Sequence, residues 1–258
     1  MALQVSRRGL VTTGSLALSG LMLSGCDRLA NAPNLLGLVR RAQGVTMGSQ
    51  RLVLDHQPLA REFKASEISP TFKANGTLHP GGEDYAAMLA GDFADWRLSI
   101  GGLVARPFKL GLADLRALPA RTQITRHDCV EGWSAIAGWT GPQLGGLLQR
   151  AGLLPSARYI VFHCADDLIG SSDGSGLYYE SIDLIDAFHP QTILAHSMNG
   201  SPLQVPHGAP LRLRVERQLG YKQAKYVMAI EAVDRLDKIG GGKGGFWEDR
   251  GYEWYAGI

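Results

Sequence analysis

One thiol, placed between a strand-like run and a tight turn, constrains this chain more than any other feature. Residues 122–127 form a short alternating run that predicts a β-strand, Cys129 follows it closely, and Gly132 suits a turn. On composition alone, a cysteine in such a place is a small buried hydrophobe or half of a disulfide. The rest of the sequence has to decide between a structural and a chemical role for this sulfur.

Other short alternating or apolar runs predict further strands at residues 96–100, 159–162, 192–196, 211–215 and 226–232. Helical spacing predicts helices at residues 112–118, 142–152 and 181–188. Pro142 suits the first turn of its helix, Gly152 suits the end, and Asn199-Gly200 predicts a tight turn. Because strands and helices do not alternate regularly, the pattern indicates an α+β domain with a largely mixed sheet.

The N-terminal residues have the pattern of an export signal. Arg7 and Arg8 precede a stretch of apolar and small residues, and Leu23-Ser-Gly-Cys26 forms a lipoprotein cleavage box. A transmembrane anchor is the alternative, but glycines and serines dilute the apolar run. We therefore predict a twin-arginine lipoprotein signal peptide over residues 1–25.

Cleavage before Cys26 makes this residue the predicted lipidation site, and two or three acyl chains hold a protein stably on a membrane. Asp27 directly after it favours retention on the inner membrane of a bacterium with two membranes. The predicted location is the periplasmic side of the inner membrane, lipid-anchored after twin-arginine export. Residues 26–65 are then a tether, and residues 66–258 form one domain with a sizeable core.

The charge balance argues against a nucleic-acid surface. The whole chain has 26 Lys and Arg against 24 Asp and Glu, and removal of residues 1–25 takes away two arginines and no acid, which leaves 24 against 24. Proteins that bind nucleic acids usually carry a clear excess of basic residues on the binding face. No nucleic-acid partner is expected.

Three spaced motifs follow one another in the domain: Cys-Val-Glu-Gly-Trp-Ser at 129–134, His-Gly-Ala-Pro-Leu-Arg at 207–212, and Gly-Tyr-Lys-Gln-Ala-Lys at 220–225. Together they resemble the molybdopterin-binding domain of the sulfite oxidase family, and within it the periplasmic methionine sulfoxide reductases. The resemblance extends over residues 70–235. Twin-arginine export agrees with it, since that route serves proteins that take up a cofactor before they cross the membrane.

The resemblance implies a sulfite-oxidase-type α+β fold of mixed sheets and short helices. No dimerisation domain of the sulfite oxidase kind follows Asp234, so a monomer is expected. It also implies a molybdenum–molybdopterin cofactor with one pterin, and Cys129 as both the metal ligand and the catalytic residue. A Cys129–Cys164 disulfide is the main structural alternative, and it would occupy the thiolate that a metal needs.

The same resemblance assigns further cofactor contacts. The pterin ends in a phosphate, which calls for cations of fixed position. At the metal end, a nearby Arg126 or His127 would lower the pKa of the Cys129 thiol. The sequence departs from the reductases at His207, where they have asparagine, and at Cys164, where they have threonine. The predicted cofactor-binding residues are Asn75, His79, Cys129, Cys164, His207, Arg212, Lys222, Gln223, Ala224 and Lys225.

The stretch after the metal-binding cysteine narrows the reaction. Sulfite oxidases carry an arginine there that helps to bind their anionic substrate, whereas residues 132–136 of this chain contain no cation. A neutral S-oxide or N-oxide, such as methionine sulfoxide in a small molecule or an oxidised protein, is therefore the expected substrate, and a membrane haem protein the expected electron partner. Sulfite dehydrogenase-like oxidation and a metal-free, lipid-anchored binding protein are the alternatives.

Overall fold

The computed structural model describes residues 44–49, 51–52, 58–171 and 173–258. The chain divides into two compact units, Met1–Leu54 and Asp55–Ile258. In the first unit, residues 44–49 and 51–52 are helical. Cys26, the signal peptide and much of the tether lie outside the described residues, so these assignments stay predictions.

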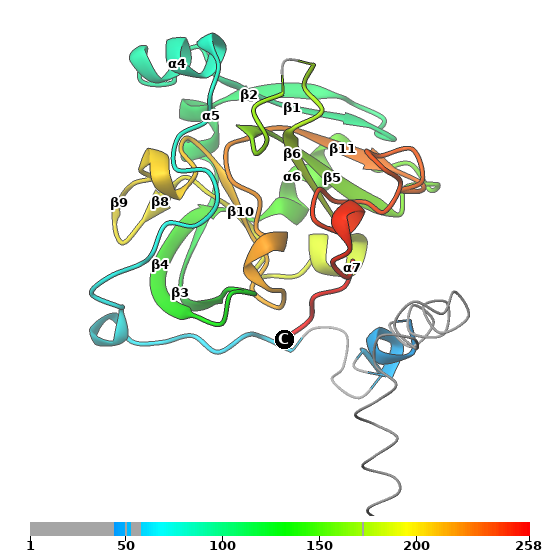
Figure 1. Cartoon of the computed structure of the whole chain (residues 1–258), viewed down its shortest axis with the longest axis horizontal. Helices are drawn as coiled ribbons and strands as arrows, with labels where there is room; N and C mark the ends of the chain where they lie inside the picture. Colours follow the sequence, from blue (N-terminus) through cyan, green and yellow to red (C-terminus); the bar gives the residue numbers. More distant parts are fainter. Residues whose placement is uncertain (1–43, 50, 53–57, 172) are drawn as a thin grey trace, which may run out of the picture. The chain divides into compact units, whose positions relative to one another are not determined.

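A five-stranded sheet forms one half of the second unit, in the order β2-β1-β11-β5-β6 (Figure 1). Its members are β1 (Arg97–Gly102), β2 (Phe108–Gly111), β5 (Tyr159–Asp167), β6 (Leu177–Asp183) and β11 (Val227–Val233). β1 runs parallel to β11, and the other neighbours are antiparallel. The sheet is therefore mixed, as the sequence indicated.

The remaining strands form two further sheets. One has the order β3-β4-β8-β9, and the other pairs β10 with β7. Their bounds are β3 (Ala120–Asp128), β4 (Ser134–Pro142), β7 (Ile193–Ala195), β8 (Ser197–Met198), β9 (Ser201–Pro202) and β10 (Arg212–Arg214). The β8–β9 turn is Asn199-Gly200, with positive φ at both residues, which confirms the predicted tight turn.

The hairpin of β3 and β4 sets the position of the key thiol. Asp128 lies opposite Ser134, so the chain reverses over residues 129–133, and Cys129 is the first residue of that turn. Gly132 adopts a positive φ of 85°, a conformation that glycine permits at little cost. β4 was not predicted, because its apolar residues are interrupted by glycine and threonine at 138, 140 and 141.

Short helices cover the sheets: α4 (Glu83–Ala90), α5 (Leu112–Ala117), α6 (Leu144–Ala151) and α7 (Leu184–Ala187). The prediction for 112–118 is confirmed. In the predicted helix 142–152, Pro142 still pairs in β4 and the helix begins at Leu144, whereas Gly152 ends it in the left-handed conformation. The prediction for 181–188 is wrong at its start, since Ser181 to Asp183 pair with β5 and only the last turn is helical.

Four single-turn 3-10 helices complete the described elements: η1 (Ala65–Glu67), η2 (Val205–His207), η3 (Gly220–Lys222) and η4 (Glu248–Arg250). The unit also includes residues that the sequence assigned to the tether. The N–H of Phe63 donates to the carbonyl of Ile124 at 2.8 Å, and the N–H of Ala60 donates to the side chain of Gln191. Residues 60–63 thus lie along the β3 edge.

The main core lies on the five-stranded sheet, where Ile100, Ile230 and Phe162 are cross-strand neighbours and almost fully buried. One face of α6 packs against it through Leu144, Leu147 and Leu148. A second, smaller cluster surrounds Trp139 of β4. Burial of side chains of this size provides most of the free energy that favours the fold.

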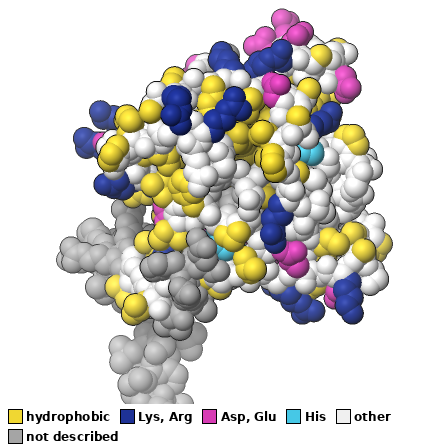
Figure 2. All heavy atoms as spheres, turned by 180° about the vertical axis from the view of Figure 1, so that it is seen from behind, with side chains coloured by type: hydrophobic (Ala, Val, Ile, Leu, Met, Phe, Trp, Pro, Cys, Tyr) yellow, Lys and Arg dark blue, Asp and Glu magenta, His cyan; other side chains and the backbone are white. Residues whose placement is uncertain are grey.

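The surface is mixed in charge. On the face drawn in Figure 2, basic side chains stand at separate places and acidic side chains lie near several of them. Within the described ranges, no helix is both long and apolar enough to cross a membrane.

Candidate active site

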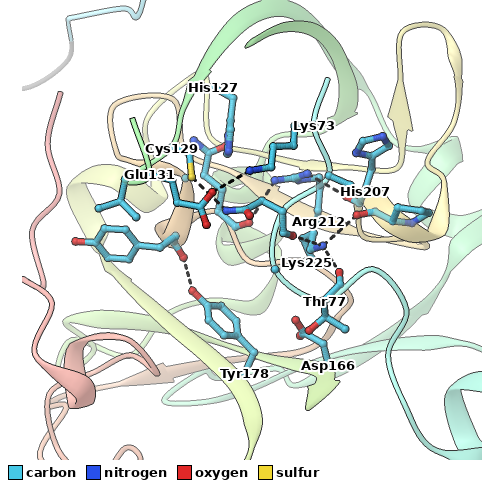
Figure 3. A pocket seen from close by; sticks show the side chains of 18 of the residues that line it. Lys73, Thr77, His127, Cys129, Glu131, Asp166, Tyr178, His207, Arg212 and Lys225 are labelled. Carbon is cyan, nitrogen blue, oxygen red and sulfur yellow. Dashed lines mark hydrogen bonds and ion pairs between the residues drawn. The ribbon is translucent and has the colours of Figure 1, made fainter. Parts of the chain in front are cut away.

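The three sequence motifs meet at one pocket, together with the segment from Phe72 to Thr77 and the end of β5. Figure 3 shows side chains from these separate parts of the chain facing one another. The structure brings together six of the predicted cofactor-binding residues along this pocket: Asn75, Cys129, His207, Arg212, Gln223 and Lys225. Because these residues are far apart in sequence, only the folded domain places them in one site.

Cys129 lies in the wall of this pocket and is 8% exposed. The turn holds it at both backbone groups: its N–H donates to the carbonyl of Trp133 at 2.9 Å, and its carbonyl accepts from Gly132 at 3.0 Å. The Asn75 amide donates to the sulfur, with Nδ2 and Sγ 3.2 Å apart. The thiol thus has a fixed position and a donor that favours the thiolate.

Burial and the carboxylate of Glu131 raise the pKa of the Cys129 thiol, whereas the backbone N–H of Glu131, the ammonium of Lys73 and the amide of Asn75 oppose the shift. Arg126 and His127 do not supply the predicted charge. Arg126 is paired with Asp128, and burial together with Arg214 holds the pKa of His127 well below its usual value, so this imidazole is neutral. The hypothesis about these two residues is wrong in its choice of partners.

Two cations line the same pocket, of which Arg212 is buried and Lys225 is half-buried. Arg212 donates to the carbonyl of His207 at 3.0 Å, and Lys225 donates to the carbonyls of Asn75 and Pro206 at 2.8 and 3.0 Å. Among the described residues neither has a carboxylate within ion-pair distance, and the Nε of Arg212 has no hydrogen-bond partner. Asp166 and Glu216 attract Lys225 and Arg212 only from beyond ion-pair distance, and a cation removed from water without a paired carboxylate is costly, so these residues favour an anion in the pocket.

Titration of these cations reflects the same environment. Burial, with Arg214 next to it, lowers the pKa of Arg212 to about 9. Burial, with Arg212 nearby, lowers the pKa of Lys225 to about 7. The pKa of His207 is lowered by burial and by both cations, and its Nδ1 lacks a partner within the described part of the chain. An arriving anion would relieve all three effects.

Asp166 was missed by the sequence reasoning. It lines the pocket from β5, and burial raises its pKa to about 6, although Lys225 opposes this shift. Its Oδ1 has no partner among the residues described. The signal was available in the strand alternation, since Asp166 is two residues after Cys164 and a buried acid inside a strand usually has a function or a partner.

Four predicted residues do not line the pocket. Cys164 and Ala224 are buried in the main core, and His79 contacts the carbonyl of Pro80 and the ring of Tyr85. Lys222 is fully buried, with its ammonium 2.5 Å from Glu180 and 2.6 Å from Glu248. The structure therefore places these side chains away from the described site, and Cys129 and Cys164 are both free thiols rather than a disulfide.

The pocket mouth has a cation that the local sequence did not reveal. Residues 132–136 have none, but Lys73 reaches Glu131 across the turn, at 3.2 Å between Nζ and Oε2. Trp133 Nε1 donates to the same oxygen at 3.1 Å. Only the tertiary structure brings Lys73 to this position, 58 residues along the chain from its partner.

Comparison with known proteins identifies the family. The family described as "Oxidoreductase molybdopterin binding domain" matches residues 86–238, more than half of the chain. The protein belongs to this family. It is therefore a molybdopterin oxidoreductase, and the mixed sheets and short helices described above are the sulfite-oxidase-like fold of the family.

Three similar proteins agree with this family assignment. A protein of Azospira oryzae, provisionally named protein-methionine-sulfoxide reductase subunit YedZ1, is 37% identical over 94% of this chain and 85% of its own length. Protein-methionine-sulfoxide reductase catalytic subunits MsrP of Xanthomonas axonopodis pv. citri and Xanthomonas campestris pv. campestris are each 34% identical over 55% of this chain and 46% of their own length. The chain thus aligns with less than half of these two catalytic subunits.

Among solved structures, the sulfane dehydrogenase SoxCD from Paracoccus pantotrophus has 23% identity and a TM-score of 0.48, over 55% of this chain and 39% of its own.

The residues of this pocket fit the cofactor of an oxidoreductase molybdopterin-binding domain. A terminal phosphate needs several donors of fixed position, and Arg212 Nε and His207 Nδ1 are buried polar atoms without partners in the described chain. A metal needs a soft donor, and the Cys129 sulfur faces the same cavity. The pocket thus offers a soft donor for the metal and, for the phosphate, polar atoms that have no partner among the described residues.

Proposed function

We propose that this protein is a cell-envelope reductase of S-oxides or N-oxides, with methionine sulfoxide as the nearest specific substrate, in which Cys129 binds the molybdenum of a single-pterin cofactor. The observation that carries the proposal is the presence in the same pocket of one buried thiol and two cations, the buried Arg212 and the half-buried Lys225, neither of which has a carboxylate within ion-pair distance among the described residues. A protein that only binds a partner has no use for this costly arrangement.

Each residue has a part in holding the cofactor. Arg212 and Lys225 supply charge to the phosphate, and the neutral His207 supplies or accepts a hydrogen bond beside them. Asn75 keeps the Cys129 sulfur in place through its amide. The bound cofactor would supply two-electron oxygen-atom transfer, for which a thiolate ligand suits a metal that changes oxidation state.

The protein can also hold a proton close to this chemistry. Reduction of a sulfoxide consumes two electrons and two protons and gives a thioether and water. Asp166 has a pKa of about 6 and lines the pocket, so it is partly protonated near neutral pH. A group with such a pKa exchanges protons readily at the pH of the cell envelope.

The choice of substrate is supported by the names of the relatives, which are methionine sulfoxide reductase subunits. It is also supported by the turn beside Cys129, where Glu131 neutralises the charge of Lys73. Sulfite oxidation is the second candidate, because Lys73 gives the mouth a cation that could attract an anion if Glu131 turned away.

Location and electron supply complete the proposal. The twin-arginine pair and the cleavage box at Cys26 support export and lipid anchoring on the periplasmic side of the inner membrane. An anchored reductase stays close to a membrane haem protein, which would provide the electrons. We expect the enzyme to work as a monomer with this partner.

The experiment compares wild-type protein with Cys129→Ser, both made in a host that supplies molybdopterin. The wild type should reduce methionine sulfoxide with an artificial electron donor and show a visible thiolate-to-metal absorption band, and the variant should lose both. Cys164→Ser is the matched control and should keep both. A folded, metal-loaded wild type that oxidises sulfite and does not reduce sulfoxides would favour the second candidate.

A further inference from the structure

The mouth of the pocket carries a small polar cluster beside Cys129, formed by Lys73, Glu131 and Trp133. All three line the pocket, and Figure 3 shows Lys73 and Glu131 joined next to Cys129. The Lys73 and Glu131 side chains are 60% and 49% exposed, so both can move without disturbing the core. This cluster therefore presents exposed polar groups in the same pocket as the thiol.

Two donors converge on one oxygen in this cluster. Lys73 Nζ lies 3.2 Å and Trp133 Nε1 3.1 Å from the same carboxylate atom, Glu131 Oε2. The Lys73 ammonium also lies 5.6 Å from the centre of the Trp133 ring. The carboxylate oxygen therefore marks a point at which an oxygen atom receives two hydrogen bonds.

Two neighbouring rings hold the indole of Trp133 in position. The Trp133 ring packs against His127 at 5.6 Å and edge-on against Phe72 at 6.2 Å between centroids. His127 is buried, and the neutral ring adds no charge of its own. The Trp133 donor is thus held in place, whereas the exposed Glu131 carboxylate has freedom to leave it.

We propose that Lys73 and Trp133 form the oxygen-binding clamp for the substrate, and that Glu131 occupies the clamp at rest and makes it select a neutral S-oxide over an oxyanion. This inference rests on the proposed function and names the group that its substrate presents. The S–O oxygen takes the place of Glu131 Oε2 on the two donors, beside Cys129 in the same pocket, so the oxygen to be removed is the atom that the two hydrogen bonds position.

Charge explains the selectivity. With Glu131 nearby, the clamp is close to neutral, so a dipolar oxygen gains two hydrogen bonds without a charge penalty. A sulfite or sulfate ion meets the Glu131 carboxylate as a like charge at short distance. The effect is modest because both side chains are solvated and screened, and so a change of about threefold in anion affinity is expected when the carboxylate is removed.

The test uses molybdenum-loaded enzyme and three variants, Lys73→Met, Trp133→Phe and Glu131→Gln. Steady-state reduction of dimethyl sulfoxide gives KM and kcat, and titration of the oxidised enzyme with sulfate, followed by the visible spectrum, gives an anion dissociation constant. Lys109→Met and Glu83→Gln, exposed residues away from the pocket, are the matched controls.

Lys73→Met and Trp133→Phe should each raise KM for dimethyl sulfoxide by roughly five- to tenfold, with a smaller change in kcat, since each removes one donor to the bound oxygen. Glu131→Gln should lower the sulfate dissociation constant by about threefold. The controls should match the wild type in both assays.

Two kinds of failure can be told apart. If the loaded wild type reduces sulfoxides but the three variants behave like the controls, the clamp is wrong and the proposed function stands. If the loaded wild type reduces no S-oxide or N-oxide, the proposed function fails and the clamp fails with it. Tighter sulfate binding in Lys73→Met than in wild type would also overturn the clamp, because it would show that Lys73 does not attract oxygen ligands.

Discussion

Two lysines three residues apart, Lys222 and Lys225, have the same chemistry and opposite surroundings. Lys222 is fully buried between Glu180 and Glu248, and these carboxylates raise its pKa despite burial. Lys225 is bonded to backbone carbonyls, and burial lowers its pKa to about 7. The first cation is satisfied inside the fold, whereas the second is left for an anion from outside.

Two arginines of β10 repeat the contrast. Arg214 holds Glu216 through Nε at 3.0 Å and Nη2 at 2.6 Å, with both side chains fully buried. Arg212, two residues earlier, has a Nε without a partner among the described residues. Side chains two residues apart on a strand point to the same face. The two arginines therefore differ because of the residues around them and not only because of the direction in which they point. Paired cations here support the fold, and unpaired cations support binding.

Loss of the paired lysine should have the largest effect. Lys222→Met leaves Glu180 and Glu248 buried together without their counter-charge, so we expect the free energy of unfolding to fall by about 3–5 kcal/mol. Urea unfolding of the cofactor-free protein measures it. A triple variant that also carries Glu180→Gln and Glu248→Gln should recover part of the loss, and a Lys222→Met protein as stable as wild type would break the comparison.

Loss of the other lysine should separate binding from stability. Lys225→Met removes a half-buried charge whose hydrogen-bond partners are neutral carbonyls and whose attraction to Asp166 is longer-ranged, so the cofactor-free variant should change by less than about 1 kcal/mol or become more stable. Its molybdenum content should nevertheless fall severalfold, because one phosphate donor is gone. Metal analysis and urea unfolding of the same preparation check both parts. Strong destabilisation without loss of metal would reverse the assignment.

The pH dependence of stability gives a sharper form of the same contrast. Lys225 has a pKa of about 7 in the folded protein and its ordinary value near 10.5 in the unfolded chain. Between these values the unfolded chain binds the extra proton, so folding is favoured as pH rises, by at most about 1.4 kcal/mol per pH unit.

As the pH increases from 7 to 10, the unfolding free energy of cofactor-free wild type should therefore rise relative to that of Lys225→Met. Urea unfolding at a series of pH values measures this difference, and other titrating groups largely cancel in it. A difference that does not change over this range would show that folding does not lower the pKa of Lys225.

The smallest effect on cofactor content is expected at Cys164. Its thiol is in the main core, and burial raises its pKa well above the usual value, so it should resist alkylation in the folded protein. Cys129 of the cofactor-free protein should react first, since it lines the pocket. Cys164→Ala should cost about 1 kcal/mol and keep the molybdenum content. Loss of metal in this variant would restore Cys164 as a cofactor contact, as the sequence predicted.

Much of the fold could be predicted from the sequence, because local residue patterns indicate many of its strands and helices. The run at 122–127 lies within an observed strand, the run at 226–232 coincides with β11 except for its first residue, and Gly152 ends its helix. β4 was missed because glycine and threonine interrupt its apolar residues, although pairing with β3 stabilises it. Ser181 to Asp183 were assigned to a helix because helical spacing ignores the strand partner that β5 provides.

The site was predicted in part for a similar reason. Cys129, Arg212 and Lys225 were found because they lie in recognisable motifs. Lys73 and Asp166 were missed because their function depends on neighbours that are distant in sequence. Lys222 was assigned to the cofactor since its motif resembles the binding segment, and only the positions of Glu180 and Glu248 give it a different role.

The most direct test of the central claim is the molybdenum and pterin content of the mature protein, purified from a host that supplies molybdopterin. Wild type is compared with a variant that carries both Arg212→Met and Lys225→Met, and Lys109→Met serves as the surface control. We predict about one molybdenum and one pterin per wild-type and control chain, and little of either in the double variant. Full loading of a folded double variant, or an empty, folded wild type, would contradict the account.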